Sequence, residues 1–126
     1  MAVKYSINEK GNPLKPTEPK KWYATAKSAG DTTLRTLSKE IAARSTVSPA
    51  DTQAVLIALT EVLVEHLADG KIVRLGDFGA FQVSVGSDGA ETKEKFSSAL
   101  IKSKKVVFRP GIDIKEMLNN LKFEKM

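Results

Sequence analysis

The sequence has 126 residues, of which 41% are hydrophobic, and a formal net charge of +5 at pH 7. This length suits one domain with an extension, and the absence of cysteine excludes a disulfide framework and a thiolate metal site. No apolar run approaches the length that crosses a bilayer, so we expect a cytoplasmic protein without a membrane partner.

The charge is unevenly distributed along the chain. Residues 1–30 hold six lysines against two glutamates, residues 31–70 hold three basic against six acidic side chains, and residues 71–126 hold eleven basic against seven acidic. Such polarity is expected of a molecule with one face that meets a polyanion. Charge by itself leaves the alternative of an ordinary mixed-charge surface open.

The first thirty residues predict a two-stranded extension. Apolar and polar residues alternate over residues 3–8, which is the period of a strand, and the breakers of residues 9–12 predict a turn. Residues 21–26 predict a second strand, which ends at residues 28–30. We expect the two strands to add to the sheet of the domain or to cover its edge.

Two features of this extension have a structural and a functional interpretation. Pro13, Pro16 and Pro19 are spaced by three, which favours a stiff linker over a ligand for an aromatic-lined domain. Trp22 and Tyr23 could stack on nucleic-acid bases, but one aromatic pair without a basic groove is weak support for a stacking platform. We therefore expect one of these two aromatic side chains to pack on the core.

Residues 31–70 predict two helices joined by a short turn. The first begins near Leu34, and the second has the clearer start: Ser48 can cap it, Pro49 suits its first position, and Asp51 follows three residues after the cap. It has a wide apolar face and ends at residues 69–70. A helix pair also raises the DNA-reading helix-turn-helix motif, but acidic residues dominate the second helix and would face phosphate badly.

Residues 71–81, KIVRLGDFGAF, form two short β-prone pieces folded about two glycines. Gly76 and Gly79 supply the backbone freedom that a chain reversal needs, and Phe78 and Phe81 keep apolar mass beneath it. Alternation of apolar and polar residues continues beyond the turn, so the second piece predicts a longer, half-buried strand.

A polar stretch, residues 86–103, separates this strand from the next segment, residues 104–111, which we interpret as a second strand that ends in a helix start. Residues 112–123 then have the apolar spacing of a closing amphipathic helix. A long polar excursion between paired strands is more often functional than idle, so we interpret residues 86–103 as an arm.

A helical first half, the phrase GDFGAF at residues 76–81, an arm and the phrase FRPG at residues 108–111 occur here in this order. Together they resemble the HU/IHF family of bacterial histone-like DNA-binding proteins. The match covers residues 31–123, and the extension before it resembles an HU-like branch associated with Bacteroidetes. The resemblance implies an α+β fold with an N-terminal helix pair, a β-sheet with a protruding arm and a C-terminal helix. We divide the chain into a two-stranded extension with its linker, residues 1–30, and a DNA-binding domain, residues 31–126.

The resemblance also implies a homodimer that binds double-stranded DNA without sequence preference and organises the nucleoid. The wide apolar helix face favours a partner chain, since buried apolar surface contributes about 25 cal/mol per Å². We expect the core of the dimer to contain Leu56, Leu59, Leu63, Phe78, Phe81 and Phe108. The expected phosphate contacts are Lys71, Arg74, Lys93, Lys95, Lys102, Lys104, Lys105 and Arg109.

The arm tip departs from the family pattern. The family has Arg-Asn-Pro-x-Thr at this place, where the proline wedges between base pairs, whereas residues 88–92 read Asp-Gly-Ala-Glu-Thr. Ala90 replaces the wedge, so we expect weaker bending of DNA than is usual in the family. The nearly neutral tip and the extra strands also leave an alternative function, an HU-like structural or protein-interaction module that has lost DNA binding.

Nothing in the sequence predicts an enzyme. His66 is the sole histidine and has no second metal ligand near it, and the acidic residues do not cluster around a phosphate loop or a nucleophile motif. We therefore expect no catalytic residue, metal, cofactor or small-molecule substrate.

Overall fold

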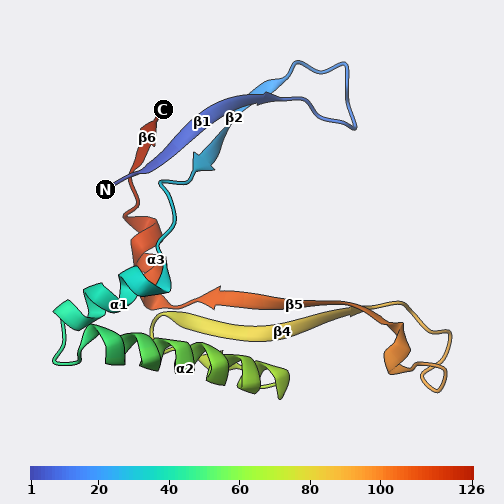
Figure 1. Ribbon diagram of the computed structural model, residues 1–126. Coiled ribbons are helices and arrows are strands. Elements are labelled where there is room, and N and C mark those ends of the chain that lie inside the picture. Colours follow the sequence, from blue (N-terminus) through green and yellow to red (C-terminus); the bar gives the residue numbers. More distant parts are fainter. The chain divides into compact units, whose positions relative to one another are not determined.

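The computed structural model describes residues 1–126, and the chain divides into two compact units (Figure 1). Residues 1–33 together with residues 117–126 form the first, which we call the terminal unit, and residues 34–116 form the second, the arm unit. Each unit contains a three-stranded sheet of its own. Both ends of the chain therefore contribute to one unit.

The sheet of the terminal unit has the strand order β2-β1-β6 (Figure 1). β1 (Val3–Lys10) and β2 (Lys21–Lys27) pair antiparallel and confirm the two predicted strands. The proline-containing residues 11–20 connect them. The expectation that these strands add to the sheet of the domain is wrong, because they form a separate sheet with the C-terminal residues.

The C-terminal strand, β6 (Phe123–Lys125), pairs parallel with β1. The Val3 amide donates to the Lys122 carbonyl at 2.8 Å, and the Met126 amide donates to the Tyr5 carbonyl at 3.0 Å. These bonds fix β6 at both of its ends.

The closing helix is shorter than predicted. α3 spans Ile112–Asn119, whereas the apolar spacing predicted a helix to Phe123. Two consecutive asparagines, Asn119 and Asn120, have low helix propensity and suit a helix end. The following residues gain ladder hydrogen bonds to β1 instead, so a long-range pairing replaces the last helical turn.

The helices of the arm unit, α1 (Leu34–Ala43) and α2 (Pro49–Ala68), agree with the prediction. The Asp51 amide donates to the Ser48 hydroxyl at 3.1 Å, as expected of a helix cap, and Pro49 opens α2. Ser38 and Thr52 are buried, and each hydroxyl donates to a backbone carbonyl four residues earlier.

The sheet of the arm unit has the order β3-β4-β5, with β3 at Val73–Arg74, β4 at Gly79–Ser87 and β5 at Ile101–Pro110. β4 and β5 pair antiparallel along their length and form the arm (Figure 1). The register shifts beside Gly86, where pairing moves from Gly86–Ser103 to Ser87–Ile101. Residues 88–100 form the tip, so the paired ribbon extends slightly further than the polar stretch suggested.

Two glycines hold the turn between β3 and β4 against the end of β5. Gly79 has a φ of +154°, and a Cβ there would lie 2.5 Å from the Arg109 carbonyl oxygen and 2.6 Å from the Phe108 ring. Gly111 lies against the Asp77 backbone with no space for a side chain, and its amide donates to the Phe78 carbonyl at 2.8 Å. The phrases GDFGAF and FRPG are therefore in direct contact.

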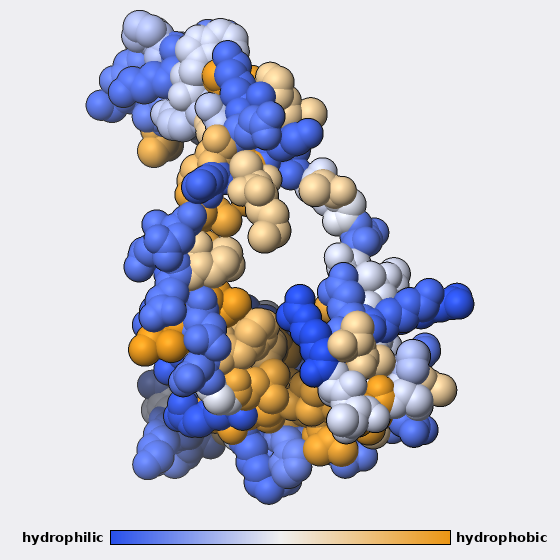
Figure 2. All heavy atoms as spheres, turned by 90° about the vertical axis from the view of Figure 1, so that its left-hand side faces the viewer, coloured by the Kyte–Doolittle hydropathy of each residue, from blue (hydrophilic) through white to orange (hydrophobic).

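A single chain buries no hydrophobic residue. Val55 and Leu59 on α2 are 63% and 39% exposed, and Phe78 and Phe108 at the sheet are 46% and 37% exposed. Figure 2 shows hydrophobic residues of the arm unit gathered in the lower part of the view and open to the viewer. An apolar surface of this kind is expected to be covered by another protein surface.

We expect Gly79→Ala to lower the free energy of unfolding by about 1–3 kcal/mol, because the new methyl group overlaps the Arg109 backbone and the Phe108 ring. Gly89→Ala is the matched control, since a Cβ there meets nothing within 4 Å. Urea denaturation followed by circular dichroism measures both changes. Equal stability of the two variants would contradict the proposed close contact.

Candidate nucleic-acid interface

One face of the arm sheet collects cationic and polar side chains, because residues of a strand alternate between the two faces. Arg74 on β3 and Arg109 on β5 are both in register with Ala80 on β4, so the two arginines flank a small residue. Lys105 is in register with Ser84 further along the ribbon. We call this surface the cationic face, and its members are Arg74, Ala80, Gln82, Ser84, Lys105, Val107 and Arg109.

The cationic face is hollowed where it meets the turn between β3 and β4. Arg74, Ala80 and Arg109 line this hollow together with Pro110 and three glycines. The small side chain of Ala80 leaves the space between the two arginine positions open. An anionic group can therefore approach two guanidinium groups from one side of the sheet.

The opposite face of the sheet is apolar near its base. Phe108 lies between two other rings, with centroid distances of 5.5 Å to Phe78 and 4.9 Å to Phe81. Val83 and Val106 continue this face in register. The structure thus brings the three phenylalanines expected in a dimer core into one cluster.

The leucines expected in the same core lie on α2. Leu56 and Leu63 are half-buried, whereas Leu59 is exposed. Leu59 shares an exposed stripe with Val55 and Val62, which are spaced by three and four residues along the helix. Of the six expected core residues, Leu56, Leu63 and Phe81 are therefore half-buried within the chain, and the other three are exposed.

The adjacent lysines of β5 lie on different faces. Lys105 belongs to the cationic face, whereas Lys104 is in register with Val85 and lies on the apolar side of the ribbon. Lys102 lies at the shift in register. Sequence reasoning grouped the three by charge and missed Gln82 and Ser84, which the period of two along β4 could have identified.

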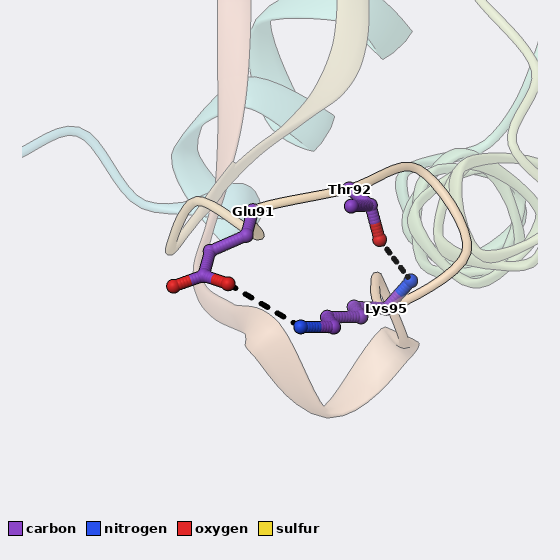
Figure 3. Close-up of polar contacts among 3 residues, drawn as sticks. All are labelled: Glu91, Thr92 and Lys95. Atoms are coloured by element: carbon purple, nitrogen blue, oxygen red, sulfur yellow. Dashed lines mark hydrogen bonds and ion pairs between the residues drawn. The ribbon is translucent and has the colours of Figure 1, made fainter.

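The remaining expected phosphate contacts lie at the base and tip of the arm. Lys71 forms an ion pair with Asp69 at 3.4 Å. At the tip, the Lys95 ammonium lies 3.3 Å from the Glu91 carboxylate, and the Lys95 amide donates to the Thr92 hydroxyl at 3.3 Å (Figure 3). Exposed ion pairs of this type contribute about 0–1 kcal/mol, so a phosphate can displace the carboxylate. Lys93 has no carboxylate partner.

No cluster of His, Cys, Asp or Glu suited to holding a metal ion is present. No helix has the length and apolar character needed to span a membrane.

Two helices and a three-stranded sheet with a long two-stranded arm define an α+β protein. A family model described as an HU domain fused to a wHTH, Ig or glycine-rich motif matches residues 1–125, and the chain belongs to this family. No curated protein matches the sequence.

The fold is similar to that of a candidate bacterial DNA-binding protein from Bacteroides vulgatus, known from its crystal structure. The TM-score is 0.67 at 12% sequence identity, and the match covers 99% of this chain but 48% of that one. The present chain thus spans about half the length of that protein. At this identity the likeness concerns the fold.

Neighbouring lysines on opposite faces provide a matched pair of variants. We expect Lys105→Gln to weaken duplex binding at least about threefold more than Lys104→Gln, because loss of one phosphate contact costs affinity in a salt-dependent way. Both variants lose the same charge at adjacent positions. Electrophoretic mobility shifts of a labelled duplex measure the two affinities. Equal losses of affinity would contradict the assignment of DNA binding to one face of the ribbon.

Proposed function

We propose that this protein binds double-stranded DNA without sequence preference as a homodimer, and that it acts as an architectural protein of the cytoplasmic nucleoid. The observation that carries the proposal is the two-faced arm sheet, with Arg74, Lys105 and Arg109 on one side and the phenylalanine cluster on the other. Membership in an HU-domain family supports it.

The cationic face is suited to phosphate contact. Arginine binds phosphate with two donors at once. Gln82 adds a neutral donor between the arginines and Lys105, and Ser84 adds one opposite Lys105. Contacts of this type fix the position of a protein on a duplex but do not read its sequence. Affinity should therefore depend on charge and salt far more than on base composition.

α2 is poorly suited to reading DNA as a recognition helix. Its first turn contains Asp51, and Glu61 and Glu65 are exposed further along. These carboxylates would face phosphate with the wrong charge. We therefore propose that the sheet, and not α2, contacts the DNA.

The exposed apolar surface supports the dimer. Val55, Leu59 and Val62 form an uncovered stripe on α2, and the phenylalanine cluster is partly exposed as well. A second copy would cover both surfaces, and each 100 Å² of apolar surface removed from water contributes about 2.5 kcal/mol. The absence of a buried hydrophobic residue in one chain supports such a cover.

The tip of the arm supports weak bending of the duplex. Ala90 has no apolar mass to insert between base pairs, and the neighbouring residues fold back on themselves through Glu91, Thr92 and Lys95 (Figure 3). The arm would then contact the phosphates through its cationic side chains without inserting between base pairs. We therefore propose less bending than a proline wedge produces.

We expect the affinity for a random-sequence duplex to fall by about 10³-fold between 50 and 200 mM salt, because three cations of the face in each of two protomers give about six phosphate contacts. Fluorescence anisotropy with a labelled duplex measures this. The triple variant Arg74→Gln, Lys105→Gln and Arg109→Gln should flatten the dependence on salt. Absence of binding at low salt would instead favour an HU-like protein-interaction module without DNA binding.

We expect the wild-type protein to sediment as a dimer and Leu59→Glu to sediment as a monomer or lose helical structure, because the new carboxylate lies in the exposed apolar stripe. Ala54→Glu is the control, since Ala54 lies on the side of α2 that carries Glu61 and Glu65. Analytical ultracentrifugation with circular dichroism separates the cases. A folded wild-type monomer would overturn the dimer.

A further inference from the structure

The sheet of the terminal unit has two chemically different faces. Tyr5 on β1, Ala24 and Ala26 on β2 and Phe123 on β6 line a shallow apolar hollow on one of them. Because β1 and β2 are in register, the residues between these positions lie on the other face. That second surface, which we call the lysine face, consists of Lys4, Ser6, Asn8, Lys10, Lys21, Tyr23, Thr25 and Lys27.

Lysines stand directly opposite one another at both ends of the lysine face. Lys4 is in register with Lys27, and Lys10 is in register with Lys21. Like charges directly opposite each other destabilise a strand pair. Two such pairs in one short hairpin are a cost to the isolated fold, and an anionic ligand would remove it.

All four lysines are available to a ligand. Each is exposed, and none forms an ion pair with a carboxylate of the chain. Glu124 on β6, in register with Lys4, is the single carboxylate on this side of the sheet. The lysine face thus keeps a clear excess of positive charge.

The centre of the lysine face is polar and ordered. The Asn8 amide group donates to the Ser6 hydroxyl at 3.4 Å and to the Thr25 hydroxyl at 3.3 Å. Tyr23, in register with Asn8, is 49% exposed. Hydroxyl, amide and phenol groups between cationic ends provide the mixture of donors that contacts phosphate and sugar in DNA complexes.

The spacing of the two lysine pairs fits a nucleic-acid backbone. Lys4 and Lys10 are six residues apart on β1, which is about 20 Å along a strand. One turn of B-DNA measures about 34–36 Å along its axis, so two lysine pairs about 20 Å apart match phosphates of the two strands that flank one groove on the same side of a duplex. A rigid duplex presents these phosphates without first being ordered.

We propose that the lysine face is a second DNA-binding surface, which holds the sugar-phosphate backbone of a duplex in addition to the cationic face of the arm. A duplex is favoured over a single strand because the face carries one aromatic ring, whereas single-strand platforms stack successive bases on several. Trp22 lies on the opposite side, in register with Glu9.

A second surface on the same chain would act through linkage. Residues 28–33 and residues 120–122 connect the strands of the terminal unit to the helices of the chain. Where both surfaces bind one duplex, the second contact forms within the complex, so overall affinity exceeds that of either surface alone. A weak contact then increases overall affinity and lengthens the bound segment. This inference rests on the proposed function for its ligand.

The test removes four charges from the lysine face and the same number from other positions. The face variant combines Lys4→Gln, Lys10→Gln, Lys21→Gln and Lys27→Gln. The control variant combines Lys15→Gln, Lys39→Gln, Lys115→Gln and Lys122→Gln and has the same net charge. A rescue variant carries arginine at the four face positions, and circular dichroism establishes that each variant is folded.

Fluorescence anisotropy with a labelled duplex of about three helical turns measures affinity over a range of salt concentrations. We expect the face variant to bind about tenfold or more weakly than the control, with a log–log salt slope that is shallower by about 0.9 for each lost contact. The arginine variant should bind like the wild-type protein. Equal affinity of the face and control variants would overturn the proposal.

Two further comparisons separate this proposal from the proposed function. If the triple variant of the arm loses binding and the face variant does not, the lysine face is not a DNA site and the arm site stands. If the face variant loses binding and the arm variant does not, the lysine face is a DNA site and the proposed arm site is wrong. Absence of duplex binding by the wild-type protein would overturn both. A larger loss with Tyr23→Ala on a single-stranded oligonucleotide than on the duplex would overturn the choice of duplex.

Discussion

The close contact between two glycines and the backbone opposite them determines the geometry of the arm unit. Gly79 leaves room for the Phe108 ring and the Arg109 carbonyl, and Gly111 rests on the Asp77 backbone. This contact fixes where β4 and β5 begin to pair, and the strand period then decides which side chains share a face. The placement of Arg109 beside Ala80, and of Phe108 beside Phe81, follows from it. A methyl group at either glycine would act on both faces at once.

Both units share one principle, a thin sheet with opposite chemistry on its two sides. In the arm unit, phenylalanines occupy one side and arginines the other. In the terminal unit, an apolar hollow beside Tyr5 lies opposite the pairs of lysines. No hydrophobic residue is buried within the single chain, so both sheets leave apolar side chains exposed on the side opposite their charged residues.

Much of this fold could be predicted from the sequence, because helix caps, turns and the alternation of apolar and polar residues depend on residues close together in the chain. The Ser48 cap and the turn at residues 76–79 are examples. β6 could not be predicted, because three residues give no periodic signal and their partner is β1. The candidate site was predicted from charge, which grouped Arg109, Lys105 and Lys104 although Lys104 lies on the other face of the ribbon. Only register separates the two lysines, and register requires a known partner strand.

The parallel pairing of β1 with β6 has a consequence for how the protein is made. Val3 pairs with Phe123, so the third strand of the terminal sheet leaves the ribosome after the whole arm unit. At about 5–20 residues per second, the β1–β2 hairpin waits roughly 5–20 s for this strand, and an isolated hairpin is marginally stable in water. During that interval its edge and the apolar side at Tyr5 are open to other nascent chains. The terminal sheet is therefore complete only when residues 123–125 have been synthesised.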